Sequence, residues 1–127
     1  MKVYQNIIRV NKEHLDALEH VNNVVYLQWV QDIAADHWYS EAGQWAEKMV
    51  WVARKHEIEY LKSAFLGESL TLKTWVEKME GFSSWRKVQV LRGEEVICQC
   101  LTHWIALNPE TQKPLRLNST ILNLFDH

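Results

Sequence analysis

Between residues 16 and 29 the chain reads DALEHVNNVVYLQW. Acidic, imidazole and amide side chains occupy its first half, and from Asn23 onward apolar residues return every three or four positions, the spacing of one buried helix face. Asn22 or Asn23 suits the N-cap, and Gly43 suits the C-terminal stop because glycine tolerates a left-handed backbone. We therefore predict one helix from Asn23 to Ala42, entered through a polar loop. Its buried rows are Val25, Trp29, Ile33 and His37, with Tyr26, Val30 and Ala34 beside them.

Runs of β-forming residues flank this helix. Turns at Glu80-Gly81 and Arg92-Gly93-Glu94 are short enough for hairpins, so the four runs after the helix are expected to form an antiparallel meander. A helix of this length spans about 30 Å and covers one face of such a sheet, which predicts an α+β fold. A short terminal helix is expected from Thr120 to Phe125, capped at Asn118-Ser119. The expected strands are Val3 to Val10, Val50 to Tyr60, Ser69 to Lys78, Ser84 to Leu91 and Glu95 to Leu107.

Length and composition predict one domain that covers residues 1–127. A chain of 127 residues with 47% hydrophobic and 24% charged residues closes a single core and is not a disordered chain. The formal net charge is -2 and the basic residues are scattered, which argues against nucleic acid as a partner. The start, MKVYQNIIRV, does not resemble a signal peptide, and no apolar run has the length of a membrane span. We expect a cytoplasmic protein without membrane contact.

The aromatic and sulfur-containing residues add two expectations. Seven Trp residues need a broad core or a buried interface, which favours self-association. Cys98 and Cys100 stand two positions apart in an expected strand and are poorly placed for a disulfide, so both are expected to be reduced and buried.

The loop before the helix has the residues for acyl-transfer chemistry. A helix N-terminus offers unpaired N–H groups and partial positive charge. A carboxylate that faces such donors has the arrangement needed to attack a carbonyl carbon while N–H groups hold the developing oxyanion. Asp16 and Glu19 are the nearby carboxylates, and thioesters are suitable electrophiles.

Two motifs resemble those of the hotdog-fold acyl thioesterases, which include 4-hydroxybenzoyl-CoA and acyl-ACP thioesterases. HVNNVVYLQW, with Asp16 before it, resembles D-x-x-G-H-V-N-N-x-x-Y-x-x-W/F, and Ile58 to Glu68 resembles I-x-Y-x-x-P-A-x-x-G-D. The resemblance extends from Val3 to Leu107. It implies a hotdog fold, in which a five-stranded antiparallel sheet wraps around one long central helix. It also implies a homodimer or homotetramer with each site built between subunits.

The resemblance assigns roles residue by residue. Asp16 matches the acidic residue that acts as nucleophile or as base for a water, and the N–H of Asn23 matches the group that polarises the thioester carbonyl. His20 falls where some acyl-ACP thioesterases place a functional histidine. Glu19 departs from the usual Gly, where a side chain could crowd the loop or add a second carboxylate. Leu18 departs from the Asn of the acyl-ACP enzymes, so their full network is absent.

Each site residue also has a structural interpretation. Asp16 can be a solvated loop carboxylate or a cap, and His20 can bond its own backbone. Asn22 and Asn23 can act as caps through their side chains, and as substrate-contacting groups beside that role. Together with His14 and Glu19, Asp16 and His20 could also be read as a metal cluster, but their spacing matches no familiar metal motif. We expect neither a metal nor a cofactor.

Other substrate-binding candidates lie outside this segment. Tyr26, with Trp29 and Trp38, could line an acyl tunnel, although aromatic residues at helical spacing are more often core or dimer contacts. Arg86 and Lys87 could meet the phosphates of coenzyme A, although strand surfaces commonly carry such charges.

The expected function is hydrolysis of an acyl-CoA or acyl-ACP thioester to free acid and thiol. The main rival is a non-catalytic hotdog acyl-CoA-binding protein in which Glu19 has spoiled the site. A hotdog hydratase or dehydratase would need a His-centred motif such as H-x-F-P-G, which the sequence lacks. A purely structural oligomer would show neither binding nor turnover.

Overall fold

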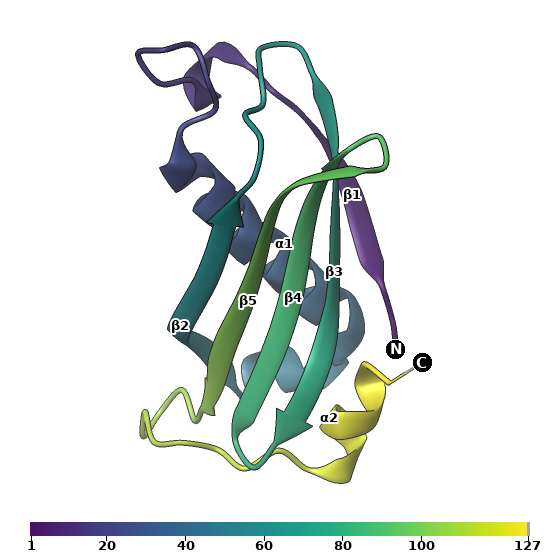
Figure 1. The fold of residues 1–127 in the computed structure, drawn as a ribbon. Helices are drawn as coiled ribbons and strands as arrows, with labels where there is room; N and C mark the ends of the chain where they lie inside the picture. The colour runs from purple at the N-terminus through teal and green to yellow at the C-terminus, as the bar shows by residue number, and fades with distance from the viewer. Residues whose placement is uncertain (127) are drawn as a thin grey trace.

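The computed structural model describes residues 1–126 and contains one antiparallel sheet crossed by one long helix (Figure 1). The helix α1 packs on one face of the sheet, and the short helix α2 lies at the end of the molecule opposite the loop that precedes α1. The sheet order is β1-β3-β4-β5-β2. The elements are β1 (Tyr4–Arg9), η1 (Lys12–His14), α1 (Asn23–Ala42), η2 (Gly43–Glu47), β2 (Val50–Tyr60), β3 (Ser69–Glu80), β4 (Ser83–Arg92), β5 (Glu95–Leu107) and α2 (Ser119–Leu124).

The expected five strands and central helix are confirmed, but the four-strand meander is wrong. Only β3, β4 and β5 follow one another in the sheet, whereas β2 pairs with β5 at one edge and β1 pairs with β3 at the other. The connection from β2 to β3 crosses the end of the sheet. The N–H of Leu61 donates to Ile97 O at 2.9 Å, and the N–H of Gly67 donates to Val10 O at 3.0 Å. The segment between β2 and β3 therefore runs from the sheet edge beside β5 to the end of β1 at the opposite edge.

Local signals set the limits of α1. Asn22 is the N-cap, with its side-chain oxygen accepting from Val24 N at 3.1 Å, and Gly43 ends the helix with a φ of 54°. The two predicted hairpin turns are confirmed, and their glycines, Gly81 and Gly93, have φ of 64° and 62°. The 3-10 helices η1 and η2 were not expected, since so few residues leave no periodic pattern.

The core has two parts that follow the two halves of α1. The first half packs Tyr26, Trp29 and Ile33 against the middle of the sheet, and the second half packs Trp38 against α2. Cys98 and Cys100 are free and buried in the first part, as expected. Among residues 1–126, no helix is long and apolar enough to cross a membrane.

Candidate active site

A closed turn holds the Asp16 carboxylate beside the start of α1. Its Oδ1 accepts hydrogen bonds from the backbone N–H groups of Leu18 at 2.9 Å and His20 at 3.1 Å. The backbone closes the same loop, because the N–H of Asp16 donates to His20 O at 2.7 Å. We name residues 16–20 the Asp16 turn. Its hydrogen bonds fix the carboxylate and occupy Oδ1, and Oδ2 has no hydrogen-bond partner among the residues described.

The Asp16 turn is anchored to the connection between β2 and β3. Val21 N donates to Ala64 O at 3.0 Å, and Ala64 N donates to the Tyr26 hydroxyl at 3.2 Å. The His20 ring packs edge-on against Phe65, with ring centroids 5.3 Å apart. Both sequence motifs therefore meet at one place, since one supplies the turn and α1 and the other supplies Ala64.

The first peptide of α1 leaves a donor available. Because the Asn22 side chain caps Val24 N, it does not satisfy the N–H of Asn23. Within the described part of the chain that N–H has no acceptor, and it lies at the positive end of a twenty-residue helix. Asn22 and Asn23 are exposed, so a carbonyl oxygen can approach from solvent.

Glu19 adopts a backbone conformation that favours glycine. Its φ is 62°, in the left-handed region, and this is the position where Gly was expected from the motif. The Glu19 side chain is exposed and does not fill the turn. The departure therefore costs backbone strain in the turn rather than crowding it.

Tyr26 lies beneath the turn rather than in open solvent. It is buried, burial raises the pKa of its hydroxyl, and its ring packs edge-on against Trp29. Its hydroxyl accepts from Ala64 N, and Tyr60 lies beside it while donating to Asn23 O at 3.3 Å. In a single chain Tyr26 therefore forms the floor that supports the turn.

Arg86 and Lys87 do not join this group. Arg86 points toward α1 and donates to His37 Nδ1 at 2.8 Å. His37 lies fourteen residues after Asn23 on α1, which is about 20 Å along the helix. At 5% exposure it cannot meet the phosphates of a ligand in solvent, so that expectation for Arg86 is not supported. Lys87, the next residue in the strand, points to the opposite face of the sheet.

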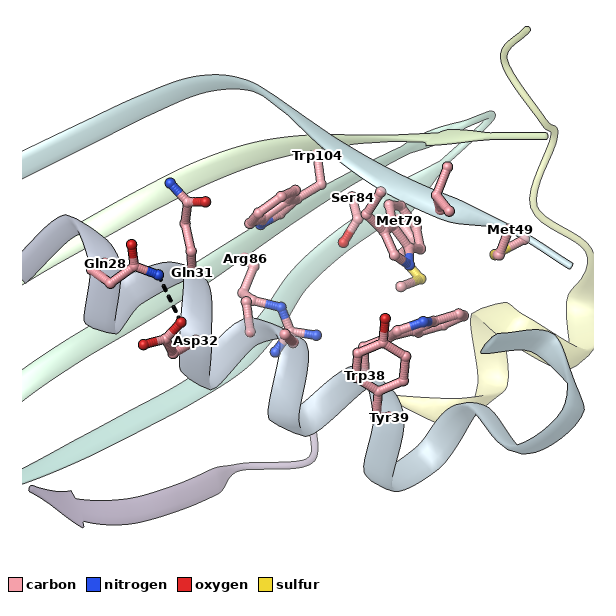
Figure 2. A pocket seen from close by; sticks show the side chains of 14 residues that line it. Gln28, Gln31, Asp32, Trp38, Tyr39, Met49, Met79, Ser84, Arg86 and Trp104 are labelled. Atoms are coloured by element: carbon pink, nitrogen blue, oxygen red, sulfur yellow. Dashed lines mark hydrogen bonds between the residues drawn. The ribbon is translucent and has the colours of Figure 1, made fainter. Parts of the chain in front are cut away.

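A cavity of about 410 Å³ opens between the sheet and the stretch of α1 from Gln28 to Tyr39 (Figure 2). Trp38, Met49 and Trp104 give it an apolar wall, and Arg86 and Ser84 add polar groups inside. Gln28, Gln31, Asp32 and Tyr39 lie on the exposed side of α1 at its mouth. No residue of the Asp16 turn lines it.

The described residues contain no group of three His, Cys, Asp or Glu side chains that could hold a metal ion. His14 instead forms part of the η1 cap, since its Nδ1 accepts from Asn11 N at 3.0 Å. His14 and Asp16 thus engage their own backbone, and the His20 ring packs on Phe65.

Sequence reasoning missed the buried cluster around Arg86. His37 was expected in a buried row, but its partner comes from a strand 49 residues away. Arg86 shares its strand face with Val88 and Val90, and this alternation was the available sign that it points inward.

Comparison with known proteins defines the class. A model described as the thioesterase superfamily matches residues 18–99. The chain belongs to this superfamily, and its general reaction class is thioester hydrolysis. A relative of known function, the long-chain acyl-CoA thioesterase FadM of Escherichia coli (strain K12), is 30% identical over 122 residues, and the match covers 92% of each chain.

Solved structures agree on the fold. The crystal structure of YbaW, a probable thioesterase from Escherichia coli, has a TM-score of 0.86 at 26% identity, covering 97% of this chain and 98% of that one. A thioesterase from Thermus thermophilus, complexed with coenzyme A and Zn, has a TM-score of 0.86 at 21% identity, covering 97% of both chains. The second likeness concerns the fold alone. Together they identify the hotdog architecture.

Glu19→Gly is expected to stabilise the protein by about 0.5 kcal/mol. Removing the left-handed strain gains about 1 kcal/mol, and the greater freedom of glycine in the unfolded chain offsets about half of it. The matched control is Ala17→Gly in the same exposed turn, at a residue without a positive φ, which should lower stability. Urea unfolding measures both changes. A loss of stability in Glu19→Gly would contradict the assignment of strain.

The unfolding free energy should fall as the pH drops from about 6.5 to about 4. Burial, and secondarily the charge of Arg86, lowers the pKa of His37 to about 4, whereas Glu41 opposes and Lys2 reinforces this effect. Folded His37 thus stays neutral in this window while the unfolded chain binds the proton. Full protonation costs on the order of 3 kcal/mol.

The control for this titration is His37→Gln, whose amide oxygen accepts from Arg86 without titrating. Urea unfolding at pH 7 and pH 4 should show a smaller loss in the variant than in the wild type. Equal losses would mean that His37 does not carry the acid sensitivity.

Proposed function

We propose that this protein hydrolyses acyl-CoA thioesters, with Asp16 as the reacting carboxylate and the N–H of Asn23 as the oxyanion donor. The observation that carries the proposal is the pairing of a carboxylate fixed through Oδ1 with a helix N-terminus that keeps a free N–H. Membership in the thioesterase superfamily supports the reaction class.

In the proposed reaction the thioester carbonyl oxygen accepts from Asn23 N–H, which stabilises negative charge as the carbonyl carbon becomes tetrahedral. Asp16 Oδ2 either takes a proton from the attacking water or attacks the carbon itself, giving an anhydride that water then cleaves. The carbon–sulfur bond breaks, and the products are a free acid and the thiol of coenzyme A. His20, in the same turn, is proposed to position Asp16 through its N–H.

We propose further that the active unit is a homodimer. β2 is an edge strand of eleven residues, and Val50, Val52 and Tyr60 along it are each 43% exposed. A long edge strand leaves backbone N–H and C=O groups unpaired along one side, and these can pair with a second strand. The start of β2 borders the cavity, and the end of β2 lies at the start of α1, where Tyr60 contacts Asn23. An antiparallel pair of β2 strands would therefore place the start of one strand beside the end of the other. Each cavity would then face the Asp16 turn of the other subunit.

Coenzyme A is the proposed carrier, supported by the 30% identity to an acyl-CoA thioesterase, and acyl-ACP is the alternative. Lys87 remains the proposed phosphate contact, because it is not buried and faces away from the core. Asn22 is proposed to line the entry to the site beside its cap role. Parallel assays with one acyl group on both carriers distinguish them.

The second candidate is a non-catalytic acyl-CoA binder, which the strained Glu19 favours because the turn departs from the motif at that residue. Such a protein binds acyl-CoA in calorimetry and releases no thiol over hours. The active enzyme releases thiol in the same sample.

Asp16→Asn should lower the rate of thiol release from acyl-CoA by at least about 100-fold while the protein remains folded. The amide oxygen can still accept from Leu18 and His20, but the amide is neither a base nor an effective nucleophile. The matched control is Asp36→Asn on the exposed face of α1, which should retain turnover. Undiminished release by Asp16→Asn would move the reacting group elsewhere.

A further inference from the structure

The cavity contains a buried cation without a counter-ion. Arg86 is 5% exposed, and no carboxylate lies within salt-bridge distance of it in residues 1–126. Its neighbours are the neutral His37, at 2.8 Å, and the Thr74 hydroxyl, at 3.2 Å. Buried charges in proteins are ordinarily paired, because an unpaired charge is costly in a low-dielectric interior.

The contacts of Arg86 do not remove its charge. Burial lowers the pKa of Arg86 to about 10, so the guanidinium remains protonated at neutral pH. His37 Nδ1 and Thr74 Oγ1 accept from the same nitrogen, Nη1, and the Phe125 ring lies 5.5 Å from Cζ. These contacts orient the group and supply no negative charge.

Apart from the Ser84 hydroxyl, which can donate and accept, the other buried polar groups of the cavity wall are donors. The indole N–H groups of Trp51 and Trp104 are buried and have no hydrogen-bond partner in the described part of the chain. Figure 2 shows Trp104 and Arg86 pointing from the sheet into the space above α1. Asp32 is the carboxylate of the lining, but it lies at the exposed mouth, where its Oδ1 accepts from Gln28 at 2.8 Å. The interior is therefore rich in donors and positively charged.

We propose that this cavity binds acyl groups that carry a carboxylate at the end remote from the thioester, so that the substrates are CoA monothioesters of dicarboxylic acids. The remote carboxylate accepts from Arg86 and from an indole N–H, the methylene chain packs on Trp38 and Met49, and the thioester lies at the mouth. This inference rests on the proposed hydrolysis and names its substrate class.

The volume and shape of the cavity agree with this class. About 410 Å³ is within the range of small-ligand sites, and the polar groups are few and lie inside an otherwise apolar wall. A methyl-terminated chain would leave the buried guanidinium and both indole N–H groups unpaired, which costs affinity.

The test compares matched pairs of CoA thioesters of equal carbon number: glutaryl with pentanoyl, adipoyl with hexanoyl, and suberoyl with octanoyl. For at least one pair, wild-type kcat/KM should favour the carboxylate by about tenfold or more, the usual worth of a charge-assisted hydrogen bond. Arg86→Gln should lose most of this ratio. Arg86→Lys, which retains a cation, should keep part of it.

Trp104→Phe provides a second, conservative test, since it removes the indole N–H and retains an aromatic ring. It should reduce the ratio severalfold. Its matched control is Trp85→Phe on the other face of the sheet, where Trp85 stacks on His103, and this variant should keep the wild-type ratio. These variants decide the question if the Arg86 variants do not fold.

The outcomes separate this inference from the proposed hydrolysis. Wild-type turnover without a carboxylate preference in any pair, or an unchanged ratio in both Arg86→Gln and Trp104→Phe, overturns the inference and leaves hydrolysis standing. If no thioester is cleaved, calorimetry with adipate tests whether the cavity binds a carboxylate. Binding that Arg86→Gln abolishes supports the cavity assignment without hydrolysis, and absence of binding to the wild type overturns it.

Discussion

The packing of α1 across one face of the sheet is the constraint on which the rest of the structure depends. Its buried rows require the sheet to cover them, and its N-terminus must then emerge at the end of the sheet, where the β2–β3 connection passes. The bonds from Val21 to Ala64 and from Ala64 to Tyr26 join these parts. The Asp16 turn is thereby held at the start of α1, because residues on both sides of Asn23 bind Ala64.

Two local costs accompany this arrangement, and both lie at candidate functional groups. Glu19 holds a left-handed backbone inside the Asp16 turn, and Arg86 holds a buried charge that no carboxylate of residues 1–126 pairs with. Strain and buried charge persist where the surrounding structure determines them, and they concentrate at functional sites. The first cost shapes the turn that carries the carboxylate. The buried charge of Arg86 makes an otherwise apolar cavity favour a ligand with a negatively charged group, which a plain hydrocarbon chain lacks.

Sequence reasoning succeeded where the signal was local. Asn22, Gly43 and the glycines of the two hairpin turns indicated the element limits, because caps and turns act within a few residues. Asp16 and Asn23 were selected from the resemblance of their motif, and their roles stay predictions. The position of β2 was missed because a run of β-forming residues does not specify its partner strand, and neighbours in sequence are the default expectation. The Arg86–His37 contact joins residues 49 apart, so neither residue alone predicts the other.

In the proposed homodimer one subunit supplies the carboxylate and the other supplies the cavity. Co-expression of Asp16→Asn with Ala35→Trp tests it, because Ala35 lines the cavity from the exposed side of α1 and a bulky replacement fills that space. Each variant alone should release little thiol. Mixed dimers contain one intact site, so the mixture should recover about one quarter of wild-type activity when subunits pair at random. A mixture that stays as inactive as its components would contradict a site shared between subunits.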